Sequence, residues 1–131
     1  MFIVGQAGDD VNVYKLTTAW DVSTASFVDS FDLSSQDNDP TGFAFSKSGD
    51  KMFVVGNQGN DVNEYTLSVA WDVSSASFVD SFAVNSQEVN PQGIWFDSSE
   101  KTMFILGKAG DDVNVYKLTT AWDVSTASFT G

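Results

Sequence analysis

The segment from Met52 to Phe78 reads MFVVGNQGNDVNEYTLSVAWDVSSASF, and near copies of it precede and follow it in the chain. One copy runs from Met1 to Phe27 and the other from Met103 to Phe129, so the period is 51 residues both times, without insertion or deletion. Repetition at a fixed period of roughly 20 to 50 residues is typical of solenoids, propellers and other repeat arrays. We therefore expect one structural unit to recur along the chain.

Each period contains short strand signals separated by turns. Residues 1–5 form an apolar run, residues 11–16 alternate between two faces, and residues 6–10 between them predict a hairpin loop. Residues 17–24 are too polar and too short for a helix, and we expect an ordered loop there. No helix is needed, so the pattern predicts an all-β fold. The expected strands are 1–5, 11–16, 26–33, 42–46, 52–56, 62–67, 77–84 and 93–97, with turns at 34–41, 47–50 and 85–91.

Four strands in a 51-residue period predict the four-stranded antiparallel blade of a β-propeller. We letter the strands of a blade A to D from the inside outwards. In the central blade A is 42–46, B is 52–56, C is 61–67 and D is 77–84. Trp95 stands in strand A where Ala44 stands in the other copy, and we expect it in the core. The chain then divides into a partial blade at 1–39, a full blade at 40–90 and a partial blade at 91–131.

Two stretches carry a family resemblance. The segment PTGFAFSKSGDKMFVVG (40–56), followed by VNEYTL (62–67), resembles the blades of YncE-like, lactonase-like and NHL propellers. The next pass, PQGIWFDSSEKTMFILG (91–107), fits the same pattern except that Glu100 stands where the turn glycine would be. The longer unit, with AWDVSTASF between strands C and D, is similar to tandem repeats of uncharacterised marine phage and bacterial proteins. The resemblance covers essentially the whole chain and implies the propeller fold, but it implies almost nothing about activity.

Composition excludes several classes of function. Cysteine, histidine and arginine are absent, which removes disulfides, thiolate or imidazole metal sites and every nucleophile that relies on histidine. The net charge of -12 disfavours nucleic acid and anionic lipid as partners. No apolar run is long enough to predict a membrane span. We interpret the acidity first as a source of solubility and second as a capacity for cations.

The blades in the chain are too few for a closed ring, which needs roughly four to eight. Either identical copies close a ring together, as a homo-oligomer, or the chain is a piece of a longer array; we favour the oligomer, because repeats that cannot bury their faces need neighbours. One solution counts three incomplete blades per chain, so that two chains give six blades, which we favour. The other counts two blades per chain, with the last blade completed by strand D of the next chain and one copy of the duplicated terminal segment displaced.

The B–C loops are candidate metal sites. Carboxylate and amide oxygens grouped after a glycine suit calcium, a hard cation with six to eight oxygen ligands. The alternative, which we favour, is that Asp10, Asp61 and Asp112 cap the turn by accepting from nearby backbone N–H groups. No cofactor is otherwise expected. The candidate ligands are Asp9, Asp10, Asp61, Asp111 and Asp112.

Two further groups are candidate ligand sites. The D–A turns, SSQDNDP (34–40) and NSQEVNP (85–91), are expected on the same face as the B–C loops, where hydroxyl, amide and carboxylate groups suit a sugar or another small polar molecule. The C–D tryptophans are expected on the opposite face, where each either stacks on a sugar ring or pins its loop against the blade. The residues are Gln36, Asp37, Asn38, Gln87 and Glu88 in the turns, and Trp20, Trp71 and Trp122 in the loops.

We expect no acidic residue to stand out from its repeat-related copies, whereas an active site is usually singular. We therefore expect a non-enzymatic propeller that serves as a scaffold or binding module and is assembled from identical subunits. A carbohydrate-binding lectin with repeated sites is the alternative, and a calcium-dependent hydrolase is a distant third.

Overall fold

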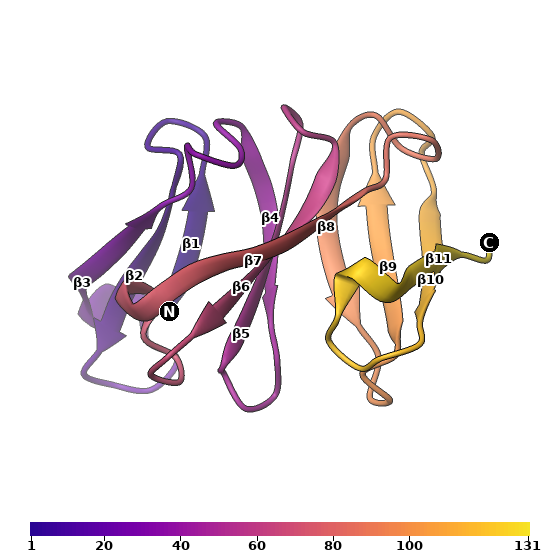
Figure 1. Cartoon of the computed structure of the whole chain (residues 1–131). Helices are drawn as coiled ribbons and strands as arrows, with labels where there is room; N and C mark the ends of the chain where they lie inside the picture. The colour runs from indigo at the N-terminus through magenta and orange to yellow at the C-terminus, as the bar shows by residue number, and fades with distance from the viewer.

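The computed structural model describes all 131 residues and contains eleven strands in three antiparallel sheets. Figure 1 shows the sheets side by side, in chain order along the molecule. The first sheet has the order β1-β2-β3, the second β4-β5-β6-β7, and the third β11-β10-β9-β8. Their bounds are β1 Phe2–Gly5, β2 Asp10–Leu16 and β3 Ala25–Asp32; β4 Pro40–Phe45, β5 Lys51–Gly56, β6 Asp61–Leu67 and β7 Ala76–Ala83; β8 Pro91–Phe96, β9 Thr102–Gly107, β10 Val113–Leu118 and β11 Ala127–Phe129.

The strands pair as successive antiparallel neighbours, so each sheet is a meander of the kind that forms a propeller blade. Successive side chains of a strand point to opposite faces, so in β5 Met52 and Val54 pack toward the first sheet and Phe53 and Val55 toward the third. The first sheet has no strand A, and its innermost strand is β1. The third sheet has only three residues in its outer strand β11, against eight in β7. This arrangement confirms the prediction of an all-β fold built from blade-like antiparallel sheets.

Two apolar cores lie between the sheets, one at each junction. We call the face of a sheet that meets the following sheet its leading face, and the face that meets the preceding sheet its trailing face. The leading face of the first sheet packs on the trailing face of the second, and the leading face of the second packs on the trailing face of the third. The two cores use the same repeat positions: Phe2, Val4 and Val11 against Met52, Val54 and Tyr65 in one, and Phe53, Val55 and Val62 against Met103, Ile105 and Tyr116 in the other.

Each C–D loop was expected to be an ordered loop without a helix, and the structure places a helical turn in it. A single 3-10 turn occurs in each, at Val22–Thr24, Val73–Ser75 and Val124–Thr126. The aspartate before each turn accepts from the backbone N–H two residues later, which is the usual capping interaction. The three-residue length explains why periodicity did not predict it. No helix of the structure is long and apolar enough to cross a membrane.

Candidate functional site

The D–A turn carboxylates Asp37 and Glu88 are buried and hold the B–C loops of the following blades. The Oδ2 atom of Asp37 accepts from the backbone N–H of Gly59 at 3.2 Å, and its Oδ1 accepts from Asp39 at 2.7 Å. Glu88 accepts from the backbone N–H groups of Ala109, Gly110 and Asn90, at 3.1, 3.0 and 2.6 Å. The D–A turns therefore lie on the same face as the B–C loops, as expected, and these two carboxylates are occupied by the chain itself.

The glutamine side chains beside these carboxylates also accept hydrogen bonds from within the chain. The phenol of Tyr65 donates to Gln36 Oε1 and that of Tyr116 to Gln87 Oε1, both at 3.3 Å. Asn38 is exposed, and its backbone N–H donates to Gln58 Oε1 at 3.0 Å. Of the five candidate residues in the D–A turns, Asn38 alone leaves its side chain free at the surface. The turns thus serve first to join successive blades.

The pKa values of these groups follow from their surroundings. Burial of Glu88 acts to raise the pKa of its carboxyl, but the backbone N–H groups of Gly110, Asn90 and Ala109 outweigh it, so the pKa lies below its ordinary value. Burial raises the pKa of Tyr116 to about 12, and burial likewise raises the pKa of Tyr65. Glu88 is therefore an ionised acceptor at neutral pH, and both phenols remain protonated donors.

The B–C loop aspartates do not gather into a metal site. No three acidic side chains lie together in a group that could hold a metal ion. Asp10, Asp61 and Asp112 each accept from the side-chain amide of the asparagine two residues later, at 2.5, 2.9 and 2.9 Å, rather than from the backbone N–H groups expected above. Burial raises the pKa of Asp61, with the charge of Asp37 as a further cause. Asp111 is exposed.

Asp9 has an unusual environment in its loop. Its Oδ1 is buried and accepts no hydrogen bond. The repeat-related Asn60, with its amide nitrogen turned inward, donates to the carbonyl oxygens of Asn57 at 3.0 Å and Val89 at 2.7 Å. A carboxylate in the same place has no proton to donate, which explains why its oxygen is left without a partner. Asp9 is thus the one B–C loop aspartate with a buried oxygen that the chain leaves without a partner.

The C–D tryptophans have different environments in the three sheets. Trp71 donates its backbone N–H to the carbonyl of Gly49 at 2.8 Å, and its indole lies 5.4 Å from the ring of Phe45 and 6.4 Å from that of Phe2. Trp122 packs in the same way, 4.8 Å from Phe96 and 5.6 Å from Phe53. Trp71 and Trp122 therefore pin their loops against strand A of their own sheet and strand B of the preceding one.

Trp20 is in the same position of the first sheet but has neither of these partners. No strand A lies beside it, no sheet precedes it, and the residue is 98% exposed. Like its two counterparts it has a positive φ, at 64°, so the loop keeps its conformation without the packing. The exposed indole therefore reflects the open end of the row of sheets.

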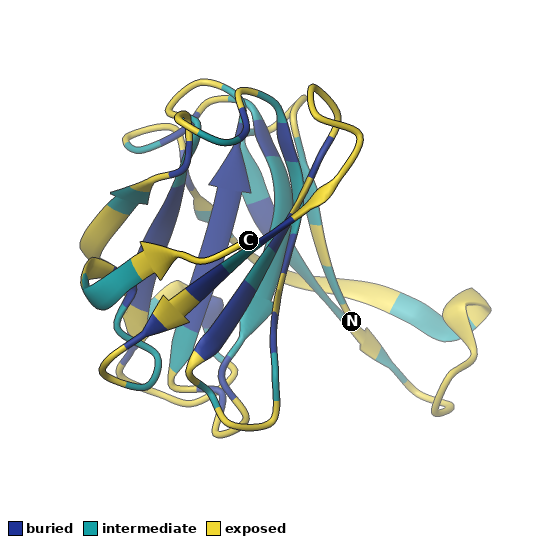
Figure 2. Cartoon of the chain, turned by 90° about the vertical axis from the view of Figure 1, so that its right-hand side faces the viewer, coloured by how far each residue is buried: buried dark blue, intermediate teal, exposed yellow.

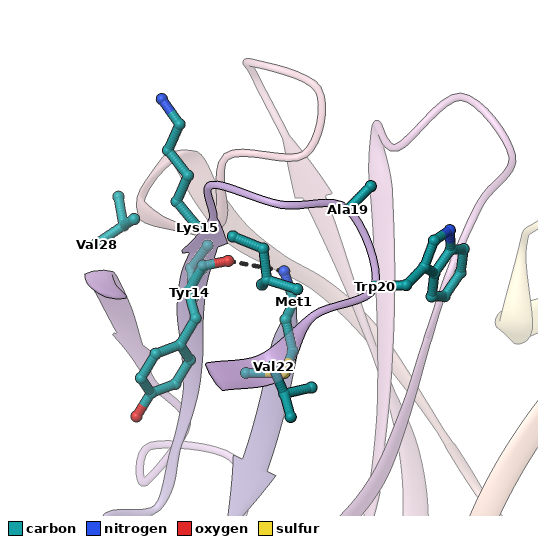
Figure 3. Close-up of a pocket in the computed structure, with 9 residues that line it drawn as sticks. Met1, Tyr14, Lys15, Ala19, Trp20, Val22 and Val28 are labelled. Carbon is teal, nitrogen blue, oxygen red and sulfur yellow. Dashed lines mark hydrogen bonds between the residues drawn. The ribbon is translucent and has the colours of Figure 1, made fainter. Parts of the chain in front are cut away.

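The trailing face of the first sheet is an open apolar surface. Figure 2 shows exposed segments beside the N-terminus, and Figure 3 shows the hollow that lies there. The hollow has a volume of about 720 Å³, and eight of its nine lining residues are apolar. Ile3 is 45% exposed and Val22 69% exposed, whereas the counterparts Val54, Ile105, Val73 and Val124 are buried. This face therefore has the side chains of a sheet junction without the opposing sheet.

The leading face of the third sheet is open in the same sense. Leu106 and Val113 are about half exposed, whereas Val55 and Val62 at the same repeat positions are buried. Trp95 lies on this face against Phe104, with ring centroids 5.3 Å apart, and is 61% exposed. The expectation that Trp95 belongs to the core was wrong, because strand position predicts which face a residue occupies but not whether another sheet covers that face.

One charged pair at the second junction has no counterpart in the repeats. Lys51 Nζ contacts Glu64 Oε1, whose carboxylate is almost fully buried, and also donates to the carbonyl of Trp122 at 3.2 Å. The backbone N–H of Val124 donates to Glu64 Oε2 at 3.1 Å. Sequence reasoning missed this pair, and the expectation that no acidic residue stands out from its copies is wrong at Glu64. Aligning the copies at 51 residues would have signalled it, since Val13 and Val115 stand at the position of Glu64.

Comparison with known proteins supports the propeller-like fold. No protein family and no curated protein matches the chain. Among solved structures, the periplasmic gluconolactonase PpgL of Pseudomonas aeruginosa is similar, with a TM-score of 0.60 and 14% identity over 95% of this chain and 32% of that one. A functionally unknown protein from Desulfotomaculum acetoxidans DSM 771 has a TM-score of 0.61 and 12% identity over 98% of this chain and 41% of that one.

These likenesses concern the fold alone, because the identities are low. The chain spans less than half the length of either similar structure. The fold of this chain is thus similar to part of two longer proteins.

Proposed function

We propose that the chain is a non-enzymatic propeller subunit, in which the open leading face of one copy receives the open trailing face of another to build a scaffold. The observation that supports this most directly is the match between the open faces and the buried ones. The third sheet presents Phe104, Leu106 and Val113, which repeat the positions of Phe53, Val55 and Val62. The trailing face of the first sheet presents the repeat counterparts of the third-sheet residues that Phe53, Val55 and Val62 contact in the second core.

Apolar faces of this kind seldom remain exposed to water. Contiguous exposed apolar patches on monomers usually mark interaction sites, and repeat units need neighbours to bury their faces. Each CH₂ group removed from water contributes about 0.8 kcal/mol, so several half-exposed aliphatic and aromatic side chains at each end favour association. The exposed inner edge of β1 adds unpaired backbone groups that further favour a covering partner.

Two chains joined in this way at both ends would give six blades. The two junctions would be related by a two-fold axis, which is the commonest symmetry of soluble oligomers. The alternative, with two blades per chain, would exchange β3 of one copy onto the third sheet of the next and displace β1 and β2. Both assemblies place identical chains in one ring, and they differ in which sheet covers Trp95.

The mass of the 131-residue chain in solution tests the proposal. Light scattering coupled to size exclusion and sedimentation equilibrium are expected to give twice the chain mass of 14.2 kDa. A mass of 14.2 kDa that persists at high protein concentration would contradict it. Tryptophan emission is expected to shift to the blue as the protein concentration rises through the dissociation constant, since Trp20 and Trp95 are exposed in the single chain.

A further inference from the structure

Two equivalent repeat positions, one in each strand A, hold side chains of very different size. Ala44 in β4 and Trp95 in β8 occupy the same position, on the leading face of their sheets. Ala44 packs against the junction with the third sheet, where it borders one hollow together with Phe96 and Trp122. Strands β4 and β8 approach closely in this region, because Thr41 Oγ1 donates to the carbonyl of Pro91 at 2.6 Å. A small residue is therefore suited to a leading face that meets a complete blade.

The open leading face of one copy and the open trailing face of another can be compared with this internal junction, position by position. Trp20 is the counterpart of Trp122, so the leading face of a third sheet would bring Trp95 toward Trp20 of the next copy. The first sheet, however, has no strand A and hence no counterpart of Phe96. The Phe96 ring lies 4.8 Å from Trp122. Because the first sheet has no phenylalanine in this place, the space beside Trp20 is empty. In Figure 3 the Trp20 indole stands clear of the other side chains that line the hollow.

We propose that the indole of Trp95 of one copy occupies the hollow beside Trp20 of a second copy, in the place that phenylalanine of strand A takes at the internal junctions. This inference rests on the proposed function and names the residue that makes the contact. An alanine at the leading face fits a blade that has its strand A, whereas a tryptophan fits a blade that lacks it. The repeat position at which the side chain changes from alanine to tryptophan would therefore face the one junction whose second sheet lacks a strand A.

The alternative with exchanged strands places a different demand on Trp95. There the third sheet would meet the complete second sheet of the next copy, and Trp95 would have to fit where Ala44 fits now. The indole would then have only the hollow of about 330 Å³ beside Ala44, against about 720 Å³ beside Trp20, and overfilling a junction is destabilising. The tryptophan therefore favours three blades per chain over two.

A second position on the open leading face is consistent with this partner. Val115 replaces the buried carboxylate of Glu64 and matches Val13, which packs in the core at the first junction with Val73. Val22 is the counterpart of Val73 and lies exposed at the open trailing face. Val115 would meet Val22 of the second copy, so no charge needs to be desolvated. The junction between two copies would thus resemble the first internal junction, which has valine at this position, and not the second, which has the buried carboxylate of Glu64.

The first test is a double-mutant cycle on assembly. Trp95→Ala and Trp20→Ala are each expected to weaken dimerisation at least about 30-fold, the effect of a tryptophan hot spot, and the double variant is expected to weaken it little further. Both residues are exposed in the single chain, so the variants should fold, which circular dichroism will check. Val69→Thr is the matched control: Val69 is also exposed, in the C–D loop of the central blade, and threonine stands at its repeat positions 18 and 120.

The second test is cross-linking, which does not require removal of either tryptophan. The chain has no cysteine, so Ile3→Cys and Val113→Cys introduce the only thiols. A short bismaleimide is expected to join the two variants when mixed, and to join neither variant to itself. Cross-linking within one variant would indicate like faces meeting and would overturn the head-to-tail contact.

The outcomes separate this inference from the proposed function. A wild-type chain that stays monomeric overturns both. A wild-type dimer that Trp95→Ala leaves unchanged or tightens overturns only the Trp95 contact and favours strand exchange. Purely additive effects of the two alanine variants would show that the two tryptophans do not touch.

Discussion

Buried carboxylates hold the B–C loops, and a glycine-to-alanine substitution can measure how much this interaction contributes to the free energy of unfolding. Gly107 is the last residue of β9, and a Cβ placed on it would overlap Oε2, Cδ and Cγ of Glu88. Its backbone does not have a positive φ, so alanine is compatible with the local conformation. Gly107→Ala must therefore displace the Glu88 carboxylate from the backbone N–H groups that it accepts from.

The expected cost follows from those hydrogen bonds. Glu88 accepts three backbone N–H bonds, and hydrogen bonds to a charged group contribute about 1.5–3 kcal/mol each. Losing one or two of them would lower the free energy of unfolding by about 2–5 kcal/mol. The reduced freedom of the unfolded chain offsets about 0.4–1 kcal/mol of this. The remainder is a large fraction of the roughly 5–15 kcal/mol that stabilises a typical domain.

The chain contains its own control for this substitution. Gly5 is at the same repeat position, but no D–A turn precedes it, and a Cβ there would meet nothing within 4 Å. Gly5→Ala should change the free energy of unfolding by no more than about 1 kcal/mol. Urea unfolding of both variants and the wild type at one protein concentration measures the difference. If Gly107→Ala is as stable as Gly5→Ala, then the Glu88 carboxylate does not stabilise the B–C loop of the third sheet.

Three further predictions concern buried polar groups, the first of them Glu88 again. Because the folded pKa of Glu88 lies below its ordinary 4.5, its stabilising contribution is present above pH 4.5 and is lost as pH falls through the folded pKa; Glu88→Gln should remove this pH dependence from the unfolding midpoint. Asp9→Asn should stabilise the chain by about 1–3 kcal/mol in thermal melts, because the amide can donate as Asn60 does; a calcium-dependent rise in wild-type melting temperature that disappears in this variant would instead indicate a cation at Asp9. Glu64→Val should cost about 3–5 kcal/mol in urea unfolding, and adding Lys51→Met should recover part of it; additivity of the two would show that the ion pair is not coupled.

Much of the blade could be predicted from the repeat. The 51-residue period, the alternation in 11–16 and the turn residues gave strands that match β2, β5 and β6 to within a residue or two. Glu100 was noticed in place of a turn glycine, and it does adopt the positive φ of Gly49, at 66° against 74°. Local sequence is informative here because turns and strand faces depend on neighbouring residues.

The candidate sites were harder to predict, because their roles depend on contacts between distant residues. Asp37 and Glu88 have the composition of a polar ligand site, yet they bind backbone N–H groups about twenty residues further along the chain. Trp20 and Trp122 have the same flanking sequence, AWDVST, but one is exposed and the other packs between two phenylalanine rings. Nothing in the local sequence distinguishes them.

The sequence alone determined the repeat unit, the strands and the face to which each side chain points, since these follow from backbone geometry and local turn chemistry. Only the tertiary structure decided which faces are covered, because burial depends on whether another sheet lies opposite. Met52 and Met1 illustrate the difference: they begin nearly identical segments, yet one is fully buried and the other is 40% exposed. The same physical reason makes the ends of the chain, rather than its central blade, the surfaces on which association is expected.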